Sequence, residues 1–426
     1  MVVLTLGPVS AMLAWPELLD AVGLGDELDL GGGTDGARSV LSVVAGGLMT
    51  VASMVFSLAF VALTLTAQTL GPRVMDFALR DQSAKVLPGL CLSGFLVSVL
   101  GLAAAANGAE GAREAGIAAM VAAALAALAL VWVAVFATRM ADLVRADAVV
   151  ARLARAFSAA AARPEAEPPA PEDQAVAEAL IARLSAEGVT VRHSRSGYID
   201  AIDPAGLLTL ASERGWSVSL LVRENDFLSP GRPVARVLGA SAEAPEEVAK
   251  EVCAHLALGD RRRLSRLPDF EGDALVEVAL RALSPGVNDP MTALACIDGL
   301  TEGLSVALRA PEPRRLWRDS DGAARLARPD CGAAWLAPRL LAPIAEEADA
   351  PMVVLRLAER LNDLSALAAR PHERAALADL GGRIARRGRS LGEASDRAAV
   401  ARAVEAAAAR LGASSQSPSE LSEKDT

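Results

Sequence analysis

Polar side chains recur along one face of an otherwise apolar, uncharged stretch at 41–70. The hydroxyl and amide members follow one another at intervals of three, four, seven and four residues, which keeps them on one side of a helix. Such a row suits either a water-lined ion path or hydrogen bonds within and between helices. The candidate pore-lining residues, with the phenylalanine as an expected hydrophobic constriction, are Thr50, Ser53, Ser57, Phe60, Thr64 and Gln68.

A second unusual run, SPGVNDP at 284–290, separates two helical patterns. Pro285 is expected to end the first helix and Gly286 to permit the reversal. Asp289 is expected to cap the helix that follows. The run therefore predicts a structural corner, or alternatively a loop whose oxygens bind a cation or a polar ligand. The residues of this corner motif are Ser284, Pro285, Gly286, Asn288, Asp289 and Pro290.

The remaining reactive side chains form no recognisable catalytic or metal-binding set. We find no nucleophile with a base, no phosphate-binding loop and no paired carboxylates in a defined frame. The four cysteines are scattered, and Cys253 and His255 lack a third ligand. A net charge of −10 argues against a nucleic-acid partner. The sequence therefore predicts a protein that is not an enzyme and has no catalytic residue, metal or cofactor.

The elements that carry these residues follow from the distribution of charge. The chain is 52% hydrophobic yet 22% charged, and its charge-free stretches predict membrane spans at 41–70, 86–106 and 116–138. Each is long enough to cross about 30 Å of hydrocarbon. The uncharged run at 2–16 is interpreted as a possible short span, which makes 1–140 a transmembrane domain of three or four helices. Because the spans carry no ionisable side chain, a proton relay is disfavoured.

Orientation follows from the short loops. The 17–40 loop is strongly acidic, whereas 71–85 and 139–155 are rich in arginine. The positive-inside rule therefore predicts a multi-pass protein of the bacterial inner membrane with its C-terminal region in the cytoplasm. Pro72, Arg73 and Arg80 are expected at the membrane interface.

The cytoplasmic part is expected to be an α+β region that contains a small β-rich module and helices. Helices are expected at 245–259 and at 271–283, the second with Asp273 as its N-cap. The predicted segments are a helix and Pro-rich linker at 141–174, a β-rich module at 175–240, a helical region with the corner at 241–310, a C-terminal helical region at 311–411 and a disordered tail at 412–426.

Four stretches resemble a known family. SMVFSLAFVALTLTAQTLGPRVMDFALRDQ at 53–82, SGYIDAID at 196–203, NDFLSPGRPVARV at 225–237 and ALSPGVNDPMTA at 282–293 are similar to recurring blocks of a bacterial membrane-protein family catalogued as domain of unknown function 2254. The resemblance runs from about 40 to about 310. It implies a membrane topology and brings no activity with it.

Two functions from different classes remain. The first is an oligomeric channel-like protein, gated or assembled by its cytoplasmic domain. The second is a membrane-anchored scaffold or sensor that binds a protein partner, a small ligand or an ion near SPGVNDP. The expected partners are the lipid bilayer and further copies of the chain.

Overall fold

The computed structural model describes residues 33–71, 86–107, 111–163, 173–240, 245–262 and 268–413. The possible span at 2–16, the interface residues Pro72, Arg73 and Arg80, and nearly all of the expected linker and tail lie outside these ranges. The chain divides into two compact units between Val149 and Val150, nine residues beyond the expected end of the transmembrane domain.

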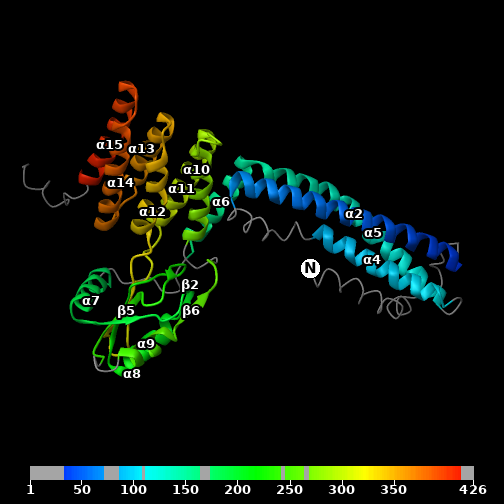
Figure 1. Ribbon diagram of the computed structural model, residues 1–426, viewed down its shortest axis with the longest axis horizontal. Helices are drawn as coiled ribbons and strands as arrows, with labels where there is room; N and C mark the ends of the chain where they lie inside the picture. The colour runs from blue at the N-terminus through cyan, green and yellow to red at the C-terminus, as the bar shows by residue number, and fades with distance from the viewer. Residues whose placement is uncertain are drawn as a thin grey trace, which may run out of the picture. The chain divides into compact units, whose positions relative to one another are not determined.

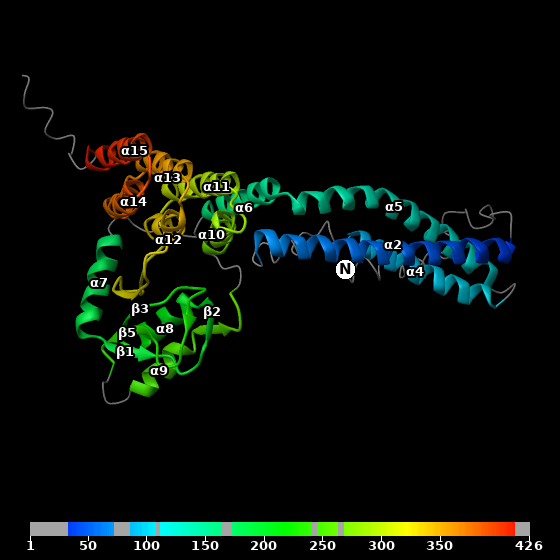
Figure 2. The same cartoon turned by 45° about the horizontal axis from the view of Figure 1, so that its top comes forward.

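Three long apolar helices make up most of what the structure describes of the first unit. Arg38 at the start of the first helix donates to the carbonyl oxygen of Ala105 at the end of the second, at 2.9 Å, so these two helices are antiparallel. In Figures 1 and 2 the first and third helices lie side by side along most of their length. The helices are α2 (Gly33–Leu70), α4 (Val86–Ala105) and α5 (Ala112–Val144).

Two glycines of α4 let the three helices approach closely. A methyl group at Gly94 would overlap Leu48 of α2, and one at Gly101 would overlap both Leu41 of α2 and Ala118 of α5. Small residues at such positions are typical of helices packed within a membrane, where close backbone approach replaces the hydrophobic effect. Helix α4 therefore lies against both of its neighbours.

Four helices of the described chain are long and apolar enough to cross a membrane, namely α2, α4, α5 and α11 (Pro290–Arg309). The first three correspond to the predicted spans at 41–70, 86–106 and 116–138. In α11 the most apolar window is 56% buried, against 22% in α2 and α5. The apolar face of α11 is therefore largely accounted for by packing within the second unit.

The second unit contains a five-stranded sheet of order β1-β5-β3-β8-β7. All neighbouring pairs are antiparallel except β3 and β8, which are parallel. One face packs on α8 (Pro204–Arg214) and α9 (Pro245–Cys253), and the other on α7 (Asp173–Glu187). The strands are β1 (Val189–Arg192), β3 (Ser217–Leu220), β5 (Pro233–Leu238), β7 (Leu316–Arg318) and β8 (Ala324–Ala327).

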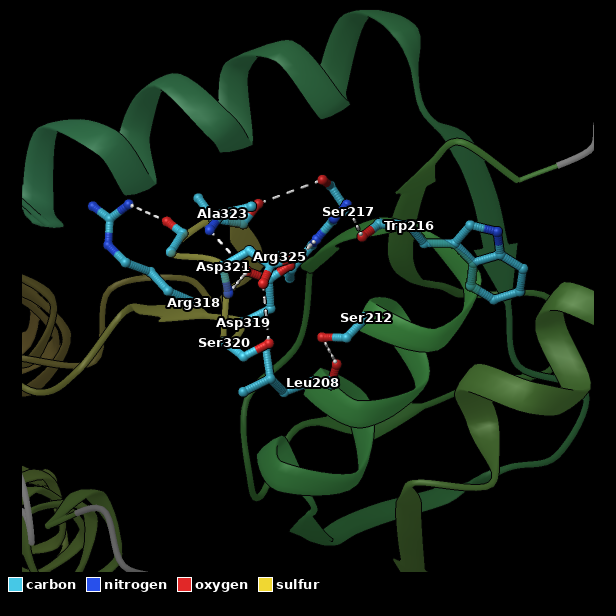
Figure 3. A network of polar contacts seen from close by, with 12 residues as sticks. Leu208, Ser212, Trp216, Ser217, Arg318, Asp319, Ser320, Asp321, Ala323 and Arg325 are labelled. Carbon is cyan, nitrogen blue, oxygen red and sulfur yellow. Dashed lines mark hydrogen bonds and ion pairs between the residues drawn. The ribbon is translucent and has the colours of Figure 1, made fainter.

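Strands β7 and β8 lie within 311–411, where a C-terminal helical region was expected. Their hairpin turn is held by Asp319, which accepts hydrogen bonds from the amides of Asp321 and Ala323 and from Arg325 (Figure 3). Arg318 then reaches Asp173 of α7 at 2.9 Å. The sheet is therefore completed by residues that lie about 90 positions beyond β5 in the sequence.

A smaller sheet of order β4-β2-β6 corrects the helix expected at 245–259. That helix ends at Cys253, and the residues after it form β6 (Leu256–Gly259). The strand pairs with β2 (Gly197–Ile202), on whose other side lies β4 (Phe227–Leu228). Backbone pairing with β2 outweighs the apolar period that favoured a longer helix.

The rest of the unit is a helical bundle. Phe157 of α6 is fully buried, and a methyl group at Gly303 of α11 would overlap its ring. Ala154 of α6 fits in the same way against Gly299. The bundle comprises α6 (Ala146–Ala161), α10 (Asp269–Leu283), α11, α12 (Ala333–Glu347), α13 (Pro351–Ser365), α14 (Pro371–Arg389) and α15 (Ala394–Ala413).

Candidate functional site

The polar row of α2 lies on the outside of the three-helix unit. Ser57 is nine residues after the buried Leu48, which at about 100° per residue places it half a turn away from the packing face. Phe60 is 72% exposed. All six candidate pore-lining residues are exposed, whereas the buried face of α2 comprises Ala37, Leu41, Leu48, Ala52, Val55, Ala62 and Thr66.

The hydroxyls of this row differ in their hydrogen bonding. Thr50, Ser53 and Thr64 each donate to the carbonyl oxygen four residues earlier, at 2.8–3.0 Å. Within the described part of the chain, the Ser57 hydroxyl and the Gln68 amide have no hydrogen-bond partner. The hydroxyls of Thr50, Ser53 and Thr64 therefore have a hydrogen-bond partner in any environment. The Ser57 hydroxyl and the Gln68 amide need water or a neighbouring molecule as a partner.

The packing register sets the depth of the row. Gly94 meets both Leu48 of α2 and Leu125 of α5, so α2 and α5 are level there. Fourteen residues farther along both helices, Ala62 is level with Arg139, the first charged residue after the apolar part of α5. Ser57 therefore lies on the hydrocarbon side of this level, and Gln68 lies about 9 Å beyond it.

The corner between α10 and α11 is closed by local hydrogen bonds. Asp289 is the N-cap of α11 and accepts from the amide and the hydroxyl of Thr292 at 3.1 and 2.6 Å. The expectation that Gly286 supplies the reversal is wrong, because the left-handed residue is Asn288, at a φ of 48°. Asparagine tolerates this conformation better than most residues. Both carboxylate oxygens of Asp289 already serve the cap, which favours the structural interpretation.

We expect Asp289→Ala to lower the free energy of unfolding by about 1 kcal/mol, the usual cost of a lost N-cap. The exposed Glu302 on α11 provides the control, and Glu302→Ala should change stability by less than about 0.5 kcal/mol. Urea unfolding of the full chain measures both values. Equal stability of the two variants would show that the cap contributes little.

A network of buried charges connects the β-rich part of the second unit with its helical bundle. Asp273 accepts from Arg262 at 2.6 Å and from Arg339 at 2.7 Å. Arg262 also contacts Asp269 at 3.0 Å, and the amide of Asn225 donates to the same carboxylate at 3.4 Å. Asp273 was expected to be an N-cap, but α10 begins four residues earlier, so its carboxylate lies inside the helix.

An aromatic ring extends this junction. Arg223 and Arg339 stand over the Trp335 ring at 4.7 and 5.1 Å from its centre. Burial lowers the pKa of Arg223, and burial raises the pKa of Asp269 despite the nearby Arg262. Sequence analysis missed this network because Arg339 lies 66 residues from Asp273, and Asn225 lies 44 residues from Asp269. The paired charges serve mutual neutralisation, which is a structural role.

One further group combines histidine and carboxylates. Among the described residues, only Glu312, His372 and Glu373 bring three such ligand atoms within 4.8 Å of one another. Arg370 also contacts both carboxylates, at 3.3 and 2.7 Å, and α14 begins at this point. A cation would have to displace the guanidinium and face the positive end of a helix, so we interpret the group as an ion-pair cluster.

This cluster predicts a pH dependence of stability. The hydrogen bond to Glu312, at 2.5 Å, raises the pKa of His372 against the effect of burial, and the charges of Asp330 and Glu373 add to it. A raised pKa in the folded state means that the protonated pair stabilises the fold below about pH 6.5. That contribution is lost as the pH rises through the raised value. We expect the free energy of unfolding to fall over this window, as followed by urea unfolding.

His372→Asn is the matched variant for this pH dependence, because it removes the titration and keeps a polar side chain. Its unfolding free energy should vary less with pH above 6.5 than that of the natural chain. An unchanged slope would assign the dependence to another group.

Comparison with known proteins gives a family model and uncharacterised relatives. A family model described as "Predicted membrane protein (DUF2254)" matches residues 1–363. An uncharacterised protein of Mycobacterium bovis and one of Mycobacterium tuberculosis are each 25% identical over 311 residues. The alignment covers 70% of this chain and 57% of either relative, so the chain spans little more than half their length. No solved structure matches the chain.

Proposed function

The chain belongs to this family of predicted membrane proteins, and from that premise we propose that it is an oligomeric, channel-like protein of the bacterial inner membrane. Its C-terminal region is a cytoplasmic domain that regulates or assembles the channel. No catalytic role forms part of the proposal.

The observation that carries this proposal is the position of Ser57. Its hydroxyl is exposed on the outside of the three-helix unit and has no hydrogen-bond partner among the described residues. It lies on the hydrocarbon side of the level marked by Arg139. An unpaired hydroxyl facing lipid is unfavourable, whereas the same group facing water is satisfied. As far as the described residues go, a single copy would leave Ser57 toward lipid, and a ring of copies would turn it inward.

The rest of the row supports the same arrangement. Copies related by rotation around an axis would place α2 nearest that axis and bring equivalent polar side chains together. Phe60 would narrow the path close to the level of Arg139. Rings of apolar side chains can gate a pore by excluding water. Gln68, which lies beyond that level, would then meet water at the mouth of the path.

The first test is the oligomeric state in detergent, measured by light scattering and followed by imaging of the particles. A rotationally symmetric ring with α2 at its centre, together with conductance in planar bilayers, is the expected result. A monomer, or a dimer without an axial cavity, would contradict the channel. The alternative, a membrane-anchored scaffold or sensor, would then be the function to pursue through the cytoplasmic domain.

A further inference from the structure

Exposed apolar side chains of the second unit are concentrated at one end of its bundle. Among the described residues of that unit, the large hydrophobic side chains left exposed are Phe227, Val287, Met291 and Met352. Val287 belongs to the corner, and Met291 is the second residue of α11. Phe227 belongs to the small sheet and packs edge-on against Tyr198.

The ion pairs of α11 place Met352 at the same end. Asp298 of α11 binds Arg356 and Arg360 of α13 at 2.6 and 2.8 Å. Twelve residues after Asp298, the carbonyl oxygen of Ala310 accepts from Arg370 at 2.8 Å. The two helices therefore run parallel, and Met291 is level with the start of α13, where Met352 is the second residue. We call Val287, Met291 and Met352 the corner patch.

Helix α6 brings the membrane-proximal part of the chain to this same end. Gly299 of α11 contacts Ala154 of α6, and eight residues earlier on both helices Met291 is level with Ala146, the first residue of α6. Only seven residues separate Ala146 from Arg139, and the helix breaks between them, because Arg145 at the end of α5 is extended. Seven residues can span at most about 25 Å. This upper limit follows from chain connectivity alone.

We propose that the corner patch docks on the surface of the lipid bilayer. Its three apolar side chains would enter the headgroup boundary, the region that takes up apolar faces of peripheral segments. Two acidic groups close to it in sequence are already engaged, since Asp289 caps α11 and Asp349 pairs with Arg387. Contact with the surface therefore places no unpaired carboxylate of these two residues against lipid phosphates. The proposal requires only that α5 spans the membrane, and it holds whether or not the protein conducts ions.

The proposal also gives the SPGVNDP run a role beyond turning the chain. Pro285 and the N-cap formed by Asp289 make the corner rigid. A rigid corner presents Val287 without the entropy cost of ordering a loop. A turn with a polar residue in place of Val287 would reverse the chain equally well.

Photo-crosslinking of the full chain in lipid nanodiscs tests this contact. Val287, Met291, Met352 or Phe227 is replaced singly by p-benzoylphenylalanine, and the bilayer contains phosphatidylcholine and phosphatidylglycerol. Phe227 is the matched control, because it is similarly exposed at 49% and lies in the small sheet. We expect lipid adducts, identified by mass spectrometry, to be several-fold more abundant at the three patch positions than at the control position.

Adducts at the patch that do not exceed those at the control would overturn the proposal. Cross-links to protein in place of lipid would also overturn it and would assign the patch to contact with another copy. A second measurement keeps the test independent of the probe itself. In a Val287→Ser, Met291→Ser background, lipid adducts at position 352 should fall, while urea unfolding stays within the range of surface substitutions.

Discussion

Ser57→Trp is expected to abolish ion flux through the reconstituted protein. Ser57 faces away from α4 and α5 at a level within the hydrocarbon, so an indole at that position adds bulk where a ring of copies would leave a path. The substitution should leave the three-helix unit folded, because the Ser57 side chain makes no hydrogen bond among the described residues and packs on none of the buried face. Flux into liposomes and single-channel recordings measure the effect.

Leu58→Trp is the control for this result. Leu58 is also exposed, at 43%, but its position is turned by about 100° from that of Ser57. It should therefore face lipid or a neighbouring helix, and flux should persist at a level close to that of the natural chain. Flux that survives in Ser57→Trp would remove the polar row from the conduction path. Flux lost in both variants would indicate a general effect of tryptophan in α2.

Asp273→Asn is expected to lower the free energy of unfolding by about 3 kcal/mol, the order of the cost when one partner of a buried ion pair is removed. The carboxylate of Asp273 receives two guanidinium groups, and its side chain is only 12% exposed. Asparagine keeps the volume but leaves Arg262 and Arg339 facing each other with one negative charge fewer. Urea unfolding of the full chain, followed by tryptophan fluorescence, measures the loss.

Asp379→Ala provides the comparison for an ion pair at the surface. Asp379 pairs with Arg383 at 3.1 Å, and its side chain is 60% exposed. Solvent screening limits such a pair to about 0.2–1 kcal/mol, so the loss should be well below that of Asp273→Asn. Similar losses in the two variants would show that the junction network is solvated and does not hold the two parts of the second unit together.

The three apolar helices of the first unit could be predicted from sequence. The stretches at 41–70, 86–106 and 116–138 correspond to α2, α4 and α5, because crossing hydrocarbon imposes a minimum length and excludes charge. The possible span at 2–16 lies outside the described residues. The polar row of α2 could also be predicted from sequence, since helical periodicity alone places its residues on one face of the helix. Family membership, too, was evident from short blocks such as SPGVNDP.

Several strands of the second unit could not be predicted from sequence. The sequence at 256–259 predicts the end of a helix. In the structure these residues form a strand, because β2 provides backbone hydrogen-bond partners. Strands β7 and β8 are only three and four residues long, and β8 is paired by β3, about 100 residues earlier. A strand of this length has little signal of its own, because its stability comes from its neighbours in the sheet.

The same division holds for the candidate sites. Local sequence was sufficient to predict the helix cap at Asp289, because its hydrogen-bond partner Thr292 is only three residues away. It was not sufficient for Asp273, because one of the two arginines that neutralise it, Arg339, lies 66 residues away in the sequence. Periodicity and charge depend on neighbours along the chain and can be read from the sequence. The junction network and the common end of α6, α11 and α13 depend on neighbours in space, and folding alone brings these together.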